Sequence, residues 1–255
     1  MSKTAQFWEE QSKGGPKGLF GAHSDPFITD LESWYIINFA LKPHPPRTLL
    51  DVGCGNGERT ELLSRYVRHL TVGVDYSEGM VRLAKKRETK RLVFKQVDLL
   101  RDDLEVKPDM VVSCRCLINM SDHRQVLRVL DSLYRTLPAG GWLVLCEVSK
   151  QGHERVNALR ASLGLGRLKM PWHNINLDEH MVLRKMHGKF EFTNLTRFGL
   201  YYTMTRVLHS KLVYPNEPNP KADINRIACD IQKRVGIGQA EEYGRQFCVV
   251  GRKLG

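Results

Sequence analysis

An acidic residue and three glycines stand at alternate positions where a short apolar run, residues 48–52, comes to its end. They are Asp51, Gly53, Gly55 and Gly57, and glycines at this spacing let backbone amides approach a ligand closely. A further acid, Asp75, ends the next apolar run at residues 70–75, where a carboxylate suits a ribose diol. The pattern therefore predicts a seat for a cofactor that contains adenosine.

Two details of this stretch separate the candidate cofactors. A dinucleotide fingerprint reads GxGxxG, but Glu58 holds the position of the third glycine, and the glycine comes one residue early, at Gly57. Asp51 would repel a diphosphate, whereas it would attract the cationic methionine moiety of S-adenosylmethionine (SAM). Both details favour SAM over NAD.

The stretch resembles the first motif of the class I SAM-dependent methyltransferases, an apolar strand followed by DxGxGxG, and the resemblance covers roughly residues 45–150. Asp75, Tyr76 and Met80 match the second motif, and Asp98 with Leu99 match the acid and the backbone amide beside the adenine. The resemblance implies SAM-dependent methyl transfer. It also implies a set of cofactor-binding residues: Asp51, Gly53, Cys54, Gly55, Asp75, Tyr76, Met80, Asp98, Leu99 and Cys114.

Apolar runs in the sequence predict the strands that position these residues, at 48–52, 70–75, 92–97, 108–114, 142–148, 190–196 and 246–252. The resemblance implies an α/β fold with a doubly wound, Rossmann-like sheet of seven strands, mostly parallel with an antiparallel edge strand. We expect residues 1–46 to form a helical N-terminal lid, with a helix over 26–41, and residues 47–255 to form the SAM-binding domain. Insertions after the fifth and sixth strands, about 150–187 and 204–243, are expected to bind the acceptor.

The first insertion holds the best candidates for recognition of the acceptor. A helix-like part at 156–168 leads into Trp172, His173 and Asn174, which combine a stacking surface, a titratable ring and an amide. In the competing interpretation, Trp172 covers a surface groove and His173 caps a helix that starts near Asp178. Both interpretations stay open at this point.

The second insertion is interpreted as a cap on the domain. Its helix has an apolar face at helical spacing, formed by Ile224, Ile227, Ala228 and Ile231. Asn225 and Arg226 on the same helix could face the substrate, but a structural role is expected for each.

A sulfonium cofactor supplies its own electrophile, so methyl transfer requires little acid–base machinery. A hydroxyl acceptor nevertheless gains from a base, and histidine titrates near neutral pH. His173 and His123 are the leading catalytic candidates, with His23 and Glu147 as further options, although His123 also fits the start of a helix near Asp122. A carboxylate or phosphate acceptor is already anionic and needs no base.

Composition limits the partners. A chain of 255 residues with 42% hydrophobic content can bury one full core, and it shows no apolar stretch of membrane-spanning length and no apolar signal core. The net charge of +11 suggests RNA, but many basic residues lie on the solvated face of the helix predicted at 78–90. The lack of a membrane-spanning stretch and of a signal core predicts a cytoplasmic protein. The six cysteines mostly fall in or beside predicted strands, so no disulfides are expected. Cys114 and Cys116 have no second pair at zinc-ligand spacing, so no metal is expected.

The leading interpretation is a SAM-dependent methyltransferase that acts on a polar small molecule or a glycan end, with oxygen as the expected acceptor atom. The insertions are loosely similar to those of bacterial methyltransferases from surface-polysaccharide and secondary-metabolite pathways. An anionic acceptor could be held by the basic residues of the first insertion: Arg155, Arg160, Arg167 and Lys169. The alternatives are an RNA or protein methyltransferase that uses the basic surface, and a non-catalytic SAM-binding subunit. The sequence leaves the oligomeric state open.

Overall fold

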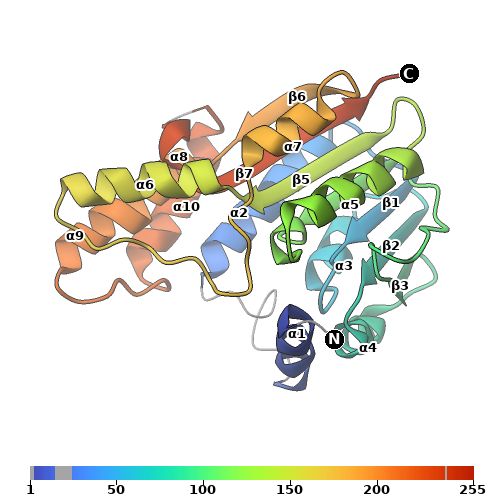
Figure 1. Cartoon of the computed structure of the whole chain (residues 1–255), viewed down its shortest axis with the longest axis horizontal. Coiled ribbons are helices and arrows are strands. Elements are labelled where there is room, and N and C mark those ends of the chain that lie inside the picture. The colour runs from blue at the N-terminus through green and yellow to red at the C-terminus, as the bar shows by residue number, and fades with distance from the viewer. Residues whose placement is uncertain (1–2, 15–24, 239) are drawn as a thin grey trace.

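A single sheet forms the centre of the computed structural model, which describes residues 3–14, 25–238 and 240–255. Its strand order is β3-β2-β1-β4-β5-β7-β6 (Figure 1). The strands are β1 Thr48–Val52, β2 Leu70–Asp75, β3 Leu92–Gln96, β4 Met110–Cys114, β5 Trp142–Val148, β6 Phe190–Thr196 and β7 Gln246–Lys253. Strand β7 runs antiparallel to β5 and β6, and the other neighbouring strands are parallel. The predicted seven-stranded, Rossmann-like α/β fold is confirmed.

Helices cover both faces of this sheet and extend past one end of it. They are α1 Lys3–Lys13, α2 Pro26–Ile36, α3 Glu58–Ser64, α4 Glu78–Ala84, α5 His123–Thr136, α6 Lys150–Ser162, α7 Glu179–Met186, α8 Gly199–Tyr202, α9 His209–Val213 and α10 Asp223–Val235. Two π-helical segments, Ile37–Leu41 and Thr203–Leu208, continue α2 and join α8 to α9. Short 3-10 turns lie at Lys85–Arg87, Leu117–Asn119 and Glu241–Tyr243.

Aspartates are the N-cap residues of three helices. Asp25 accepts from the backbone N–H of Phe27 at the start of α2, and Asp122 accepts from that of Gln125 at the start of α5, at 3.1 and 2.9 Å. Asp178 accepts from two backbone N–H groups of α7. These carboxylates satisfy donors that a helix leaves unpaired in its first turn. The start predicted near Asp122 is confirmed.

Successive strand residues supply two cores, one on each face of the sheet. Met110 and Val112 of β4 pack with Tyr35 of α2, whereas Val111 packs with Leu130 of α5. Figure 1 shows α5 and α7 on one face and α2 and α3 on the other. Because both faces are covered, the central strands are continuous apolar runs, which is why their bounds could be predicted closely.

The first insertion begins with a helix earlier than the predicted segment 156–168. Helix α6 starts after Ser149, whose Oγ accepts from the backbone N–H of Gly152 at 2.7 Å, and it ends at Ser162, before Gly164 takes a left-handed conformation. The predicted start was too late because the polar first turn carries no apolar periodicity. The predicted end was too late because the chain leaves the helix before Gly164. Helices α6, α8, α9 and α10 gather beside the end of the sheet (Figure 1).

The buried face of α10 also differs from the predicted one. Ile227 is 45% exposed, whereas Asn225 and Gln232 are buried with Ala228. Gln232 accepts from the backbone N–H of Tyr201 at 3.0 Å and donates to the backbone carbonyl of Gly236 at 2.7 Å. Polar side chains occupy this face because they pair with the backbone of neighbouring segments.

All six cysteines belong to the described residues, and each is a buried, unbridged thiol. Within the described ranges, no helix is both long and apolar enough to cross a membrane.

Candidate functional site

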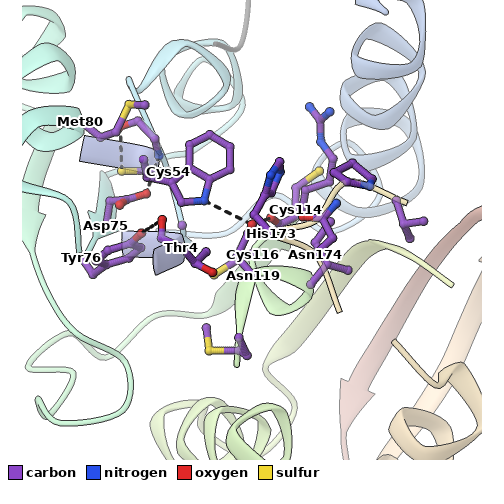
Figure 2. Close-up of a pocket in the computed structure, with 18 of the residues that line it drawn as sticks. Thr4, Cys54, Asp75, Tyr76, Met80, Cys114, Cys116, Asn119, His173 and Asn174 are labelled. Carbon is purple, nitrogen blue, oxygen red and sulfur yellow. Dashed lines mark hydrogen bonds between the residues drawn. The ribbon is translucent and has the colours of Figure 1, made fainter. Parts of the chain in front are cut away.

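A cavity of about 1000 Å³ opens at the carboxyl ends of the strands. It lies where the strand order reverses between β1 and β4, the usual ligand position in open α/β sheets. Its walls include every residue predicted to bind the cofactor: Asp51, Gly53, Cys54, Gly55, Asp75, Tyr76, Met80, Asp98, Leu99 and Cys114. His173 and Asn174 line it as well, across the cavity from Asp75, Tyr76 and Met80 (Figure 2).

The three glycines of the first turn have different roles. Gly55 has a φ of 55°, and a Cβ there would meet nothing within 4 Å, so this residue presents backbone to the open cavity. A Cβ on Gly53 would lie 2.6 Å from that of Cys116, and one on Gly57 would lie 2.7 Å from the ring of Phe94. The second glycine therefore leaves room for a ligand, while the other two permit close packing of the chain around it.

Asp75 ends β2 with both carboxylate oxygens held in place. One oxygen accepts from the backbone N–H of Gly55 and the other from that of Ser77, each at 2.9 Å. Burial raises the pKa of this carboxyl group. A carboxylate fixed at the cavity wall retains lone pairs for the two hydroxyls of a ribose.

Asp51 lies deeper in the same wall and is 2% exposed. Its Oδ2 accepts from the hydroxyl of Thr60 at 2.6 Å, and burial raises its pKa to about 6. A cationic ligand group beside this carboxylate would favour its ionised form. The site thus fits the positively charged methionine end of SAM.

The third cofactor position is a tight turn after β3. The backbone N–H of Asp98 donates to Asp102 at 2.7 Å, and the Asp98 side chain accepts from the backbone N–H of Leu100 at 3.0 Å. Asp98 and Leu99 thereby face the cavity together with Met80, a carboxylate beside apolar groups that suits a purine and its amino group.

Helix α1 crosses the mouth of the cavity. Its Glu9 accepts from the hydroxyl of Ser77 at 2.6 Å and from the backbone N–H of Gly79 at 2.9 Å. The indole nitrogen of Trp8 donates to the side chain of Asn119, in the segment after β4, at 3.2 Å. The backbone carbonyl of Thr4 accepts from the hydroxyl of Tyr76 (Figure 2). The helix therefore contacts both sides of the cavity.

His173 is packed among aromatic rings that this helix brings to the first insertion. Its ring stacks on Phe7 with centroids 4.3 Å apart, and Trp8 and Trp172 meet it edge-on. Burial lowers the pKa of His173, and its Nδ1 is buried without a hydrogen-bond partner among the described residues. His173 therefore offers a neutral imidazole at the cavity wall, and Asp178, not His173, caps α7.

The other residues proposed from sequence lie elsewhere. His123 is half-buried at the start of α5, where its Nε2 lies 3.0 Å from the carbonyl oxygen of Asn176, and it is not among the lining residues. Trp172 is 64% exposed and reaches the site only through its contacts with Phe7 and His173. His23 lies outside the described residues.

Glu147 has a different task from the catalytic one considered for it. It is fully buried, accepts from the hydroxyl of Ser113 at 3.0 Å, and also accepts from three consecutive backbone N–H groups, residues 116–118. Burial raises its pKa to about 7. This carboxyl group holds the chain after β4 in the shape that forms the cavity floor.

Of the four basic residues proposed to hold an anionic acceptor, only Lys169 lines the cavity. Arg155 and Arg167 pair with glutamates, and Arg160 donates to backbone carbonyls and to Ser210. Sequence reasoning missed the arginines that do line it: Arg59, Arg101, Arg115, Arg206 and Arg245. They come from five separate segments, and only Arg101 and Arg115, which follow β3 and β4, had positions that could have indicated the site.

Cys116 also lines the cavity, so both members of the CxC pair face it. The chain turns between them, because Arg115 has a left-handed φ of 56°. The described residues contain no group of three or more histidine, cysteine or acidic side chains that could hold a metal ion.

Comparisons with known proteins agree with this geometry. Residues 49–141 match the family model described as a methyltransferase domain. The chain is 34% identical over 117 residues to malonyl-(acyl-carrier protein) O-methyltransferase of Bacillus cereus, which is 45% of this chain and 41% of that protein. It is 35% identical over 104 residues to trans-aconitate 2-methyltransferase of an Acidovorax species, with 40% and 39% covered. The matches span about two fifths of the length of these relatives.

A solved structure extends the likeness to the whole fold. The N-methyltransferase NodS of Bradyrhizobium japonicum, in complex with S-adenosylhomocysteine, superposes with a TM-score of 0.61 over 99% of this chain and 98% of its own, at 14% identity. The match to the methyltransferase model covers residues 49–141, and the chain has the fold of the class I SAM-dependent methyltransferases. The cofactor of that family is SAM, as predicted.

Proposed function

We propose that this protein transfers a methyl group from SAM to an oxygen atom of a polar small molecule or a glycan end. The observation that carries the proposal is the single cavity, in which all ten cofactor candidates meet His173 and Asn174. Its volume of about 1000 Å³ is at the upper end of the range for small-molecule sites, which leaves space for an acceptor beside a cofactor.

The residues of the chain divide the work of the reaction. Asp75 and Asp98 orient the adenosine, and Asp51 faces the cationic end of the cofactor. When bound, SAM supplies an electrophilic methyl group: an acceptor oxygen's electron pair forms the new C–O bond, and the pair of the breaking C–S bond stays on sulfur. His173 takes the hydroxyl proton on its imidazole ring, whose neutral form is favoured because burial lowers its pKa.

The N-terminal segment acts as a lid in this proposal. Helix α1 bridges Ser77 and Asn119 across the cavity mouth and places Phe7 against His173. A closed mouth excludes water from the reacting atoms and fixes the base. The insertions at about 150–187 and 204–243 then supply the acceptor side, through His173 and Asn174 from the first and Pro218 and Pro220 from the second.

RNA and proteins are weaker candidates for the acceptor. Two relatives are named for malonyl-(acyl-carrier protein) and trans-aconitate, which supports a small acceptor group over a polynucleotide. The basic face of α4 and the following turn, moreover, is partly neutralised, because Arg87 pairs with Glu58 and Glu61.

A cofactor-turnover screen tests the proposal. We expect release of S-adenosylhomocysteine when the protein is given SAM and a panel of small hydroxy acids and acidic sugars, with methyl appearing on oxygen by mass spectrometry. Bulk RNA under the same conditions should give no turnover, and retention on RNA should vanish at moderate salt. Turnover on RNA alone would contradict the proposal, and no turnover with any acceptor would support a non-catalytic SAM-binding subunit.

A further inference from the structure

The acceptor side of the cavity is unusually rich in arginine. Besides Arg101, which pairs with Asp98 after β3, the lining arginines are Arg59 on α3, Arg115 after β4, Arg206 on the π-helical segment before α9, and Arg245 directly before β7. No local pattern joins them in the sequence, and the fold alone brings them to one wall. An arginine that pairs with a carboxylate of the protein has a structural role, whereas an arginine without such a partner is available to a ligand.

Three of these arginines have a buried carboxylate partner. Glu32, which is fully buried, lies 2.7 Å from Arg59 and 3.3 Å from Arg115, and it also accepts from Gln246. Asp25 pairs with Arg206 and accepts from the hydroxyl of Tyr201. These ion pairs give the three arginines a structural role within the protein.

Arg245 has no carboxylate partner among the described residues. The ranges outside them, 1–2, 15–24 and 239, contain no Asp or Glu. Its Nε is buried without a hydrogen bond in the described structure, and its Nη2 reaches only the sulfur of Met170 at 3.3 Å, a weak acceptor. Its guanidinium is therefore a cation with unused donors at the cavity wall.

The charged and titratable groups around Arg245 do not compensate for it. Tyr202 and Arg206 are the neighbours that act on it, and burial lowers its pKa. His153 on α6 is affected by Arg245 in turn, and burial, with Arg245 adding to it, lowers the pKa of His153 to about 4, so this ring is neutral. A desolvated cation in such surroundings is unfavourable unless another group supplies negative charge.

Backbone contacts hold Arg245 in position. Its carbonyl oxygen accepts from the backbone N–H of Ser149 at 2.8 Å, which ties it to the start of α6. The next residue, Gln246, pairs with Val148 at the carboxyl end of β5. This is the acceptor side, because the cofactor candidates come from β1, β2 and the ends of β3 and β4. The guanidinium is preorganised there for two parallel hydrogen bonds to an oxyanion.

We propose that Arg245 is a specificity-determining residue that binds a carboxylate or phosphate group of the methyl acceptor. The inference rests on the proposed function and narrows its substrate class to anionic molecules. The reactive hydroxyl then lies on the same molecule, within reach of His173, and Arg245 fixes its distance from the methyl group. Lys169, exposed at the same cavity, adds to the attraction of acidic molecules.

The test measures thermal stability and cofactor binding of the full chain. Wild type, Arg245→Met and Arg135→Met are melted with S-adenosylhomocysteine present, in a series of succinate and of inorganic phosphate concentrations at constant ionic strength. Arg135 is a matched control, because it is exposed in the last turn of α5 and does not line the cavity. Calorimetry with S-adenosylhomocysteine then measures the cofactor site of each variant.

We expect the Tm of wild type and of Arg135→Met to rise with succinate or phosphate, and that of Arg245→Met to stay flat. Without anion, Arg245→Met should melt about 2–4 °C above wild type, because an unpaired buried charge is removed. The anion that acts identifies the group as carboxylate or phosphate. A wild type that responds to neither anion, or an Arg245→Met variant that responds like wild type or melts lower without anion, overturns the proposal.

The cofactor measurement separates this inference from the proposed function. Arg245→Met should bind S-adenosylhomocysteine with the affinity of wild type. If it loses that binding, Arg245 serves the cofactor and the inference is wrong, while methyl transfer remains supported. If wild type itself does not bind S-adenosylhomocysteine, the proposed function fails, and the response to succinate and phosphate still decides whether an anion site exists.

Discussion

His173 shows how a side chain gains a chemical property from its packing. Phe7, Trp8 and Trp172 surround the imidazole and remove water from it, which lowers its pKa. The sequence indicated a titratable ring next to a tryptophan, and the structure adds the two aromatics of α1. A base that is neutral at physiological pH is useful only if its free nitrogen faces the acceptor, and this is testable.

Replacing the proposed base should lower turnover and change its pH dependence. With an acceptor from the turnover screen, His173→Ala should reduce kcat by about 100-fold, the lower end of the contribution of a general base. Wild-type activity needs the neutral imidazole, so it should fall as the pH drops through a pKa that lies below 6.5. Steady-state kinetics across pH 5–8 measure both effects.

His123→Ala is the matched control, because His123 lies outside the cavity and bonds to the loop before α7. Its kcat and pH profile should equal those of wild type. A His173→Ala variant that keeps the wild-type kcat and acid limb would show that the transfer needs no base from this residue, as expected for a carboxylate acceptor oxygen.

At the scale of elements, helix α1 is held to the domain by few contacts. Glu9 bonds to Ser77 and Gly79 at the start of α4, and further links join Tyr76 to Thr4, Trp8 to Asn119 and Phe7 to His173. An element with so few contacts can open and close without unfolding the sheet. In the proposed lid role, movement of α1 would admit the cofactor and release the products.

Removing the main anchor of α1 should weaken the closed state. Glu9→Ala should raise the Kd of S-adenosylhomocysteine about 10-fold, since two charge-assisted hydrogen bonds are lost. The Tm without ligand should hardly change, because the core lies elsewhere. Calorimetry measures the Kd and thermal unfolding the Tm, and trypsin should cleave within residues 3–13 faster than in wild type.

Glu10→Ala serves as the control, since Glu10 is the adjacent exposed residue and removes the same charge. It should bind S-adenosylhomocysteine like wild type and be cleaved at the wild-type rate. Equal affinities of Glu9→Ala and wild type would contradict the role of α1 as a lid.

Elements differed in how well the sequence predicted them. Strands β1, β5 and β6 were predicted to the residue because buried apolar runs bounded by turn residues are local signals. The face of α10 was not, because Gln232 is buried by pairing with backbone from α8, a contact distant in sequence. The cofactor residues were predictable because they lie at the ends of such local runs. Arg245 was missed because its place at the cavity depends on contacts between segments that are distant in sequence.

For the whole molecule, the basic residues behind the net charge of +11 lie in two kinds of place. Part of it lies on helix surfaces, as at Arg87, where glutamates offset it, and part lies inside the cavity, where Arg245 has no carboxylate partner among the described residues. Composition suggested a polyanion outside the protein, whereas the fold concentrates positive charge where a small anionic acceptor would bind. A count of charged residues cannot distinguish charge on the surface from charge in the cavity, because the fold decides which residues are buried.

The central claim is that the cavity holds SAM through the acids at the ends of β1, β2 and β3. The most direct measurement is calorimetry with S-adenosylhomocysteine on wild type, Asp75→Ala and Asp103→Ala, the last being an exposed acid outside the cavity. We predict that wild type and Asp103→Ala bind with equal affinity and that Asp75→Ala binds at least about 10-fold more weakly, because its carboxylate no longer accepts from the ribose. Unchanged affinity of Asp75→Ala, or no binding by wild type, would contradict the account.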